Sequence, residues 1–400
     1  MRTVHRITSL FVVLVTLYLG ITGTLVQLID LQALIRHAPA TDPDMMAIRE
    51  DKDGPDDFAV LGTAEYTAPT LPASFDYQAA LPRLIDAARA SLGNGAALDY
   101  VEVRMGEGGP IGLVQSGQQL LRYDFATGQS RASPEPRRER PVTSLRNEIK
   151  HIHRMTTFGD WALWINPIVG IGLGVFVVTG VVMYWQLLSA RKRIKRPQWF
   201  WQAGGWWRTL HRWSSIVASL FILVIALSGT WLAVESLIFG YYLSAHLPKP
   251  GQPFVRQSGV NPLPDAQLPA MLSTTLAAYK SSRVDQPLKV VRLRVYGGMR
   301  QGVIIAGLGD DTQQVVFNAA TGRKASLTEP GYPPTGFPFG WQAHQIAKQV
   351  HRGSYIGLSG RWMDLFGGAA IIYLSASGVV MYVDMWNRRR RSGRRALLWT

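Results

Sequence analysis

A His-Arg dipeptide occurs four times in this chain, so half of its eight histidines are followed by arginine. Each dipeptide lies near the start of a long apolar segment. Imidazole is a strong ligand for haem iron, and a neighbouring guanidinium can pair with a haem carboxylate. We therefore interpret four histidines as candidate axial ligands: His5, His153, His211 and His351. The arginines that follow them are candidate partners of the haem carboxylates: Arg6, Arg154, Arg212 and Arg352.

The chain contains no cysteine. Disulfides, thiolate-ligated haem, covalently attached haem and iron–sulfur clusters are therefore excluded for this chain. A redox centre would have to use histidine, methionine or a non-covalent cofactor. If the four histidines act in pairs, we expect about two non-covalent haem b groups per chain.

Four apolar segments must position these histidines: 7–29, 161–188, 212–238 and 362–386. Each is long enough to cross a hydrocarbon core of about 30 Å, which takes about 20 helical residues. The first segment is longer than the apolar part of a usual signal peptide, and no small-residue cleavage site follows it closely. The sequence therefore predicts an α-helical membrane protein with four transmembrane helices.

The spans belong to an internal repeat. Residues 4–25 resemble 210–231, and residues 153–184 resemble 351–382 without a gap. Parallel repeats of this kind are related by an axis along the membrane normal. Such an axis brings His5 to face His211, and His153 to face His351. The repeat therefore predicts two bis-histidine sites, one near each face of the membrane.

Basic residues give the expected orientation. The runs RKRIKR (191–196) and RRRRSGRR (388–395) lie directly against the ends of apolar segments. By the positive-inside rule, both termini and the middle loop are cytoplasmic, and the two polar regions lie on the opposite side. We interpret the net charge of +15 as this orientation signal, and we expect no nucleic-acid partner.

The two polar regions share one plan, a helix followed by strands. The first has helical spacing over 77–92 and strand-like alternation over 98–105 and 119–125. The second repeats this plan with a helix at 265–280 and strands at 288–296, 302–308 and 313–318. An Ala-Thr-Gly turn follows the last strand of each region. The sequence therefore predicts two small α+β domains.

The expected divisions of the chain follow from these patterns. They are a first span (1–30), a first polar domain (31–150), a second span with its histidine segment (151–190), a basic Trp-rich loop (191–210), a third span (211–238), a second polar domain (239–345), a fourth span with its histidine segment (346–387) and a basic tail (388–400).

Some readings stay open. A histidine beside arginine at a membrane surface can simply extend to the lipid headgroups, but four at repeat-related positions favour ligation. His344 and His151 are secondary candidates for binding metal or substrate, although the sequence favours structural or solvated roles for both. The Trp-rich loop is an interfacial belt or a docking surface for an electron donor.

The histidine segments before the second and fourth spans raise a geometric difficulty. His153 precedes Gly180 by 27 residues, which is about 40 Å if all of it is helical. That length would lift His153 above the hydrocarbon. Gly159 and Gly357, with Asn166-Pro167 further along, are the expected places where the helix breaks and folds the histidine back.

The His-Arg openings, with Thr22-Gly23, Thr179-Gly180 and the Asp-x-x-Thr-Gly ending of the first polar region, resemble the PepSY-associated transmembrane family. The resemblance covers nearly the whole chain. It implies PepSY-like periplasmic domains, haem b on the histidines, a bacterial inner-membrane location and a periplasmic ferric substrate such as a ferric siderophore. Two departures, Asn318 for Asp and Ser377 for Thr, touch no proposed ligand.

Three functions follow as hypotheses, of which the third is a quinol-linked electron carrier that reduces a partner protein instead of the chelate itself. In the first, electrons from a quinol or a cytoplasmic reductase enter at His5/His211, leave from His153/His351, and reduce a ferric chelate to release iron. In the second, the polar domains bind a peptide or restrain a peptidase, and the histidines are structural. A pure anchor does not need four His-Arg dipeptides, so the sequence favours the first over the second.

Overall fold

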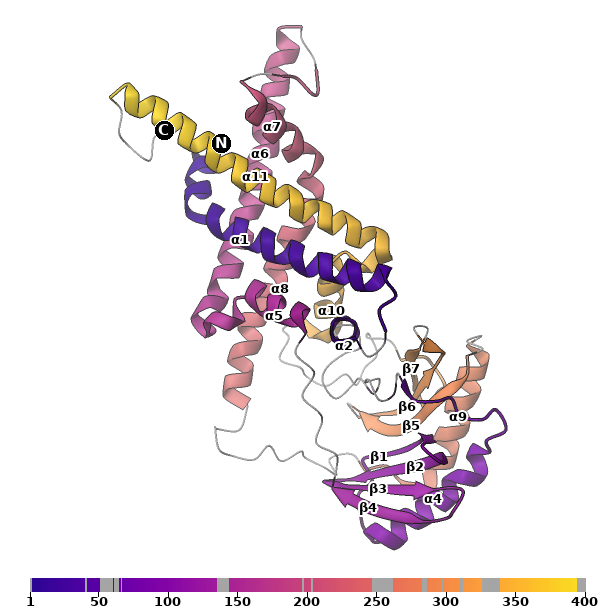
Figure 1. The fold of residues 1–400 in the computed structure, drawn as a ribbon. Helices are drawn as coiled ribbons and strands as arrows, with labels where there is room; N and C mark the ends of the chain where they lie inside the picture. The colour runs from indigo at the N-terminus through magenta and orange to yellow at the C-terminus, as the bar shows by residue number, and fades with distance from the viewer. Residues whose placement is uncertain are drawn as a thin grey trace. The chain divides into compact units, whose positions relative to one another are not determined.

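The computed structural model describes the chain apart from residues 1, 40–41, 51–59, 61–64, 66, 135–143, 196–197, 203, 247–261, 283–285, 297, 310–311, 326–338 and 394–400. It divides into two compact units. The helical unit comprises Met1–Arg36, Thr143–Ala245 and Gly336–Thr400. The sheet unit comprises His37–Val142 and His246–Thr335. Figure 1 shows the elements of both.

The helical unit contains the predicted spans. Among the described residues, four helices are long and apolar enough to cross a membrane: Thr3–Ile35, Asp160–Arg193, Ser219–Tyr241 and Ser354–Arg391. The corresponding elements are α1 (Arg2–Ile35), α6 (Ile165–Arg193), α8 (Ser219–His246) and α11 (Gly357–Arg391). Shorter helices precede three of them: α5 (Leu145–His153), α7 (Trp206–Val217) and α10 (Gly340–His351). In this unit α1 packs along both α6 and α11 (Figure 1).

The third span predicted from sequence begins on α7, whereas the candidate span of the structure begins with α8 at Ser219. The amide of Ala218 donates to the carbonyl of Ser214 at 2.9 Å, and the amide of Ile222 donates to the carbonyl of Ala218 at 2.9 Å. Helical hydrogen bonding therefore runs from α7 into α8. The predicted span 212–238 covers the junction of these two elements.

The histidine segments fold back as the glycines predicted. Between α5 and α6, Gly159 has φ +90°, and between α10 and α11, Gly357 has φ +69°. Glycine adopts this region at no steric cost, so the chain turns sharply there. Asn166-Pro167 marks no break, because Pro167 lies in the first turn of α6, where proline is tolerated.

A buried ion cluster ties three helices of this unit together. Asp30 of α1 accepts from Arg146 Nε of α5 at 2.5 Å and from Arg361 Nη1 of α11 at 2.6 Å. All three side chains are buried. Gln27 Nε2 donates to the carbonyl of Arg361 at 2.8 Å. The cluster fixes α5 and α11 against one end of α1.

The sheet unit holds a seven-stranded antiparallel sheet, counted over the described residues, with the order β4-β3-β2-β1-β5-β6-β7. Its strands are β1 (Tyr100–Gly106), β2 (Gly109–Ser116), β3 (Gln119–Asp124), β4 (Ser130–Pro134), β5 (Leu288–Tyr296), β6 (Met299–Ala306) and β7 (Gln313–Asn318). The sequence divides the polar regions into two domains. In the structure their strands join in one sheet, because β1 pairs with β5, with Val101 opposite Leu293.

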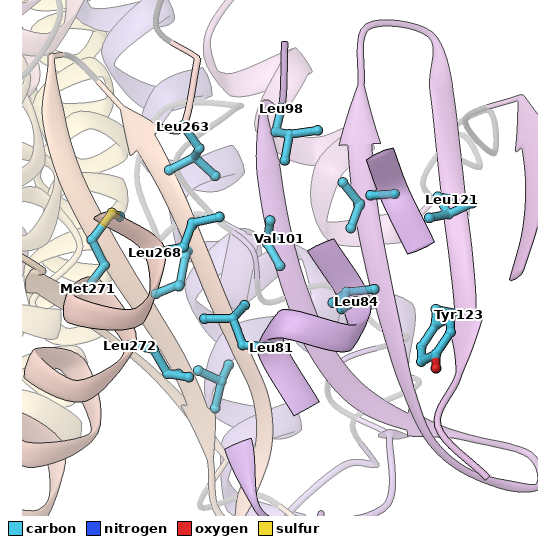
Figure 2. Packing of buried hydrophobic residues seen from close by; sticks show 14 of the residues in the cluster. Leu81, Leu84, Leu98, Val101, Leu121, Tyr123, Leu263, Leu268, Met271 and Leu272 are labelled. Atoms are coloured by element: carbon cyan, nitrogen blue, oxygen red, sulfur yellow. The ribbon is translucent and has the colours of Figure 1, made fainter. Parts of the chain in front are cut away.

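Two helices cover one face of this sheet, α4 (Tyr77–Leu92) and α9 (Leu268–Ser281). Figure 2 shows the apolar core between them and the strands, with Leu84, Leu268 and Val101 among its members. Leu84 and Leu268 are fully buried, and burial of a leucine contributes about 1.5–3 kcal/mol. Asp76 caps α4 by accepting from the amides of Gln78 and Ala79.

The Ala-Thr-Gly segments are turns, as predicted. The carboxylate of Asp124 accepts from the amides of Ala126 and Thr127, and Asn318 makes the equivalent pair of bonds in the second copy. An amide oxygen serves this turn as well as a carboxylate oxygen does. The Asn318 departure from the motif therefore leaves the turn intact.

Candidate functional site: four histidines held by helical hydroxyls

Of the first pair of candidate ligands, His5 lies in the long helix α1 and His211 lies in the short helix α7 that precedes α8. His5 of α1 bonds through Nδ1 to Thr179 Oγ1 of α6 at 2.8 Å. His211 of α7 bonds through Nδ1 to Ser377 Oγ of α11 at 2.7 Å. Each imidazole is therefore held by a hydroxyl from the second long helix of its own repeat. The expectation that the Ser377 departure touches no proposed ligand is therefore wrong, although serine keeps the hydroxyl that threonine would supply. The His5 ring also lies 5.5 Å from the ring of Phe176.

The other two candidates lie on the short helices that fold back. His153 of α5 bonds through Nδ1 to Thr22 Oγ1 of α1 at 2.9 Å. His351 of α10 bonds through Nδ1 to Ser228 Oγ of α8 at 3.2 Å. Tyr18 adds a second tie, because its hydroxyl donates to the carbonyl of Ile152 at 2.8 Å and holds α5 on α1.

The structure brings His153 and His351 together. Their ring centroids lie 6.4 Å apart, and the ring planes differ by 32°. An imidazole nitrogen lies about 2 Å from a metal ion that it binds, so this separation leaves room for one metal ion between the rings. The repeat pairing predicted from sequence therefore has its expected geometry at this pair.

His211 lies close enough to His5 to feel its charge. Burial, followed by the charge of His5 as the smaller cause, lowers the pKa of His211 to about 4. Burial likewise lowers the pKa of His153 to about 4, with His351 as the next cause. Both histidines are therefore neutral at physiological pH. The neutral imidazole is the form that binds a metal.

A glycine follows each of the four hydroxyl residues, and two of these glycines lie directly against an imidazole. A Cβ on Gly229 would lie 2.9 Å from Cε1 of His351, and a Cβ on Gly23 would lie 3.1 Å from Cε1 of His153. Both distances are shorter than ordinary van der Waals contact. Because glycine has no side chain, the two imidazole rings can pack directly against the helix backbone at these positions.

The candidate arginines have protein partners. Arg212 donates from Nη2 to the carbonyl of Trp201 at 2.9 Å, and its guanidinium lies 4.5 Å from the Trp201 ring. Arg352 donates from Nε to Ser354 Oγ at 2.9 Å. Arg154 reaches Ser236 Oγ of α8 at 3.5 Å. Arg6 lies one residue after His5 on α1. Their pairing with haem carboxylates stays a prediction.

The secondary metal candidates have other partners. His344 Nδ1 lies 2.9 Å from Oε2 of the buried Glu235, and His151 Nδ1 lies 3.0 Å from Thr156 Oγ1. The described part of the chain contains no group of three or more His, Cys, Asp or Glu side chains that could hold a metal ion. Among the described residues, neither histidine therefore gains the further ligands that a metal site outside haem needs.

In the loop before α7, Trp201 is buried and stacks on Tyr184, with ring centroids 5.5 Å apart. Arg191 and Arg212 lie over the same indole. Trp199, Trp206 and Trp207 are exposed. One tryptophan thus anchors the loop, and the exposed ones form the surface predicted to act as an interfacial belt or a docking surface.

The hydroxyl partners are the part of the site that the sequence missed. Thr22-Gly23 and Thr179-Gly180 were visible as a repeated motif, as was the replacement of threonine by Ser377. A hydroxyl followed by glycine at matching positions of both repeats was the available signal. Assigning a role to these hydroxyls required knowing which histidine each helix faces.

Comparison with known proteins identifies the family of the chain. A family model described as the PepSY-associated TM region matches residues 2–384. No curated protein matches the chain significantly. The family match includes all four histidines, their four hydroxyl partners, the first three candidate spans and the fourth up to residue 384, and the chain is therefore a membrane protein that belongs to the PepSY-associated TM family.

Proposed function

We propose that this chain is a di-haem oxidoreductase of the bacterial inner membrane, which passes electrons across the membrane to reduce a periplasmic ferric chelate such as a ferric siderophore. The observation that carries the proposal is the His153/His351 pair, with ring centroids 6.4 Å apart and both Nδ1 atoms bonded to hydroxyls. Two imidazoles in that arrangement would hold one iron ion between them.

The donor set fits haem b. Four imidazoles occur in two repeat-related pairs, and the chain has no cysteine for covalent attachment. When bound, haem with two imidazole ligands supplies one-electron transfer. The chain's own residues contribute ligation, orientation of the rings, and helices that separate the site from water. Arg6, Arg154, Arg212 and Arg352 are the proposed carboxylate partners.

The two sites suit transfer across a bilayer because they lie far apart along α1. His5 is on the first turns of this helix, and His153 lies against Gly23. Gly23 follows His5 by 18 residues, which is about 27 Å of helix and close to the thickness of a hydrocarbon core. With the N-terminus in the cytoplasm, His5/His211 is the cytoplasmic site and His153/His351 the periplasmic one.

The substrate follows from the chemistry of iron. One electron converts Fe(III) in a chelate to Fe(II), and hard oxygen ligands hold Fe(II) much less tightly. The reaction therefore releases iron and leaves the chelator unchanged. The electron comes from a quinol or from a cytoplasmic reductase.

A vesicle assay tests this function. Purified full-length protein is placed in sealed vesicles, with a membrane-impermeant reductant on the His5/His211 side and a ferric siderophore with a ferrous indicator on the other. We expect Fe(II) to form with the wild type and not with protein-free vesicles. A haem-loaded protein that leaves the chelate oxidised would contradict the reductase assignment.

Orientation gives a separate prediction. Because basic runs flank α6 and α11, we expect reporter fusions at about residues 100 and 300 to be periplasmic and a fusion at about residue 200 to be cytoplasmic. Paired reporters, one active on each side of the membrane, make the measurement. A reversed result would exchange the cytoplasmic and periplasmic assignments of the two histidine pairs.

Gly229, the glycine that lies against His351, gives a further prediction. In Gly229→Ala the new Cβ would lie 2.9 Å from Cε1 of His351, so the ring must move and its bond to Ser228 loosens. We expect less haem at the His153/His351 site in the reduced-minus-oxidised spectrum. Gly240→Ala in the same helix is the control, because that Cβ would meet Leu163 at an ordinary 3.9 Å. Equal spectra for the two variants would show that the close approach is unimportant.

A further inference from the structure

We infer that four helical hydroxyls are positioning residues that fix the tautomer of each histidine, so that every imidazole carries its proton on Nδ1 and offers the lone pair of Nε2. They are Thr22, Thr179, Ser228 and Ser377. The inference rests on the proposed function, because it assigns these residues a role in haem ligation.

The inference follows from counting protons at each hydroxyl. A hydroxyl has one hydrogen to donate and lone pairs to accept with. Thr179 donates to the carbonyl of Val175 at 2.6 Å, and Ser228 donates to the carbonyl of Val224 at 2.6 Å. The other two make the same kind of bond, Thr22 to Tyr18 at 2.9 Å and Ser377 to Leu374 at 3.2 Å.

Once the hydroxyl hydrogen points at a carbonyl, only lone pairs remain for the histidine. The Nδ1 atom must then be the donor in all four contacts. A neutral imidazole that carries hydrogen on Nδ1 has its lone pair on Nε2. Each bond therefore selects the nitrogen that can bind iron and also limits rotation of the ring.

The arrangement occurs four times on different pairs of elements, at 2.7–3.2 Å. Its members are always the residue before a glycine, at repeat-related positions. Ser219 in α8 shows that a helical serine need not act this way. It donates to the carbonyl of Ile216 at 2.8 Å, and that bond involves no histidine.

A hydroxyl is also a mild partner compared with a carboxylate. An acceptor on the far ring nitrogen makes an imidazole ligand more basic, which stabilises the ferric state. A carboxylate would do this more strongly, but burying its charge within a span is costly. Removing the hydroxyl should therefore lower ligand basicity and move the midpoint potential of that site to a more positive value.

The test uses the full-length protein and compares Ser228→Ala with Ser219→Ala, two identical changes in one helix. We expect Ser228→Ala to weaken haem retention at the His153/His351 site about 10–100-fold and to raise its midpoint potential. The His5/His211 site is the internal control and should keep its spectrum. Ser219→Ala should match the wild type, and Ser228→Thr, which restores the hydroxyl, should recover both values.

Thr22→Val provides the second variant, because it keeps the shape of threonine and removes only the hydroxyl. It should affect the same site as Ser228→Ala. If both variants retain wild-type haem affinity and midpoint potential, the positioning role is wrong. The proposed function would stand in that case, because the wild type would still carry haem. If Ser228→Ala disturbs both sites, Thr22→Val is the deciding variant. Haem loss confined to the His153/His351 site supports the positioning role, and wild-type haem retention contradicts it. A wild type without haem would instead overturn the proposed function, and this inference with it.

Discussion

Alanine at His351 is expected to remove the same haem as alanine at His153 and to leave the second haem spectrally intact. An iron with two imidazole ligands loses its low-spin ligation when either ring is removed. The two rings lie 6.4 Å apart, so they must share one phenotype. By the repeat, His5→Ala and His211→Ala should share the other. Reduced-minus-oxidised spectra of the four single variants make the measurement.

The same variants should also stop vesicle-based reduction of the ferric chelate, because losing either site leaves a gap of most of the bilayer. His344→Ala and His151→Ala are the controls and should retain both haems, since these side chains bond to Glu235 and Thr156. If the His5 and His211 variants lose different haems, the pairing is wrong. If all four variants keep both haems, the histidines are interfacial residues.

The second large effect is expected at Asp30. Asp30→Asn removes the charge that Arg146 and Arg361 share in a buried site. Breaking a buried ion pair from one side costs about 3–5 kcal/mol, because the charge that remains is still buried. We expect a large fall in the thermal stability and folded yield of the detergent-solubilised protein. Size-exclusion chromatography after heating steps measures both.

Asp384→Asn is the matched control for that change. Asp384 also bonds to two arginines, Arg208 and Arg388, but all three side chains are substantially exposed. Exposed ion pairs contribute about 0–1 kcal/mol, so this variant should stay close to the wild type. Equal stability of the two variants would show that the Asp30 cluster does not hold α5 and α11 on α1.

Local patterns predicted much of the architecture. Helix 77–92 and strands 288–296 and 313–318 match α4, β5 and β7 in their bounds. The sequence missed β2, because Gly109, Pro110 and Gly112 are poor strand residues. A tertiary contact requires glycine at position 112, because a Cβ added there would lie 2.5 Å from the side chain of Leu84 of α4. Such a requirement comes from a helix elsewhere in the chain and has no local signature.

Prediction of the candidate site from sequence meets the same limit. The spacing of the repeat predicted which histidines face one another, but the hydroxyl partners depend on contacts between helices. His344 is a further case. The offset that aligns His153 with His351 also aligns Arg146 with His344. Arg146 pairs with Asp30 in the first repeat, and His344 pairs with Glu235 in the second. His344, a metal-ligand candidate from the sequence, thus occupies the repeat position of Arg146, whose role is structural.

The central claim is that the four histidines hold haem, and the haem content of the purified protein tests it most directly. A pyridine haemochrome assay on full-length protein from haem-replete cells should give about two haem b groups per chain. Because the chain has no cysteine, acidic acetone should extract all of it. A colourless preparation would contradict the account and would favour a peptide-binding or peptidase-regulating role for the polar regions.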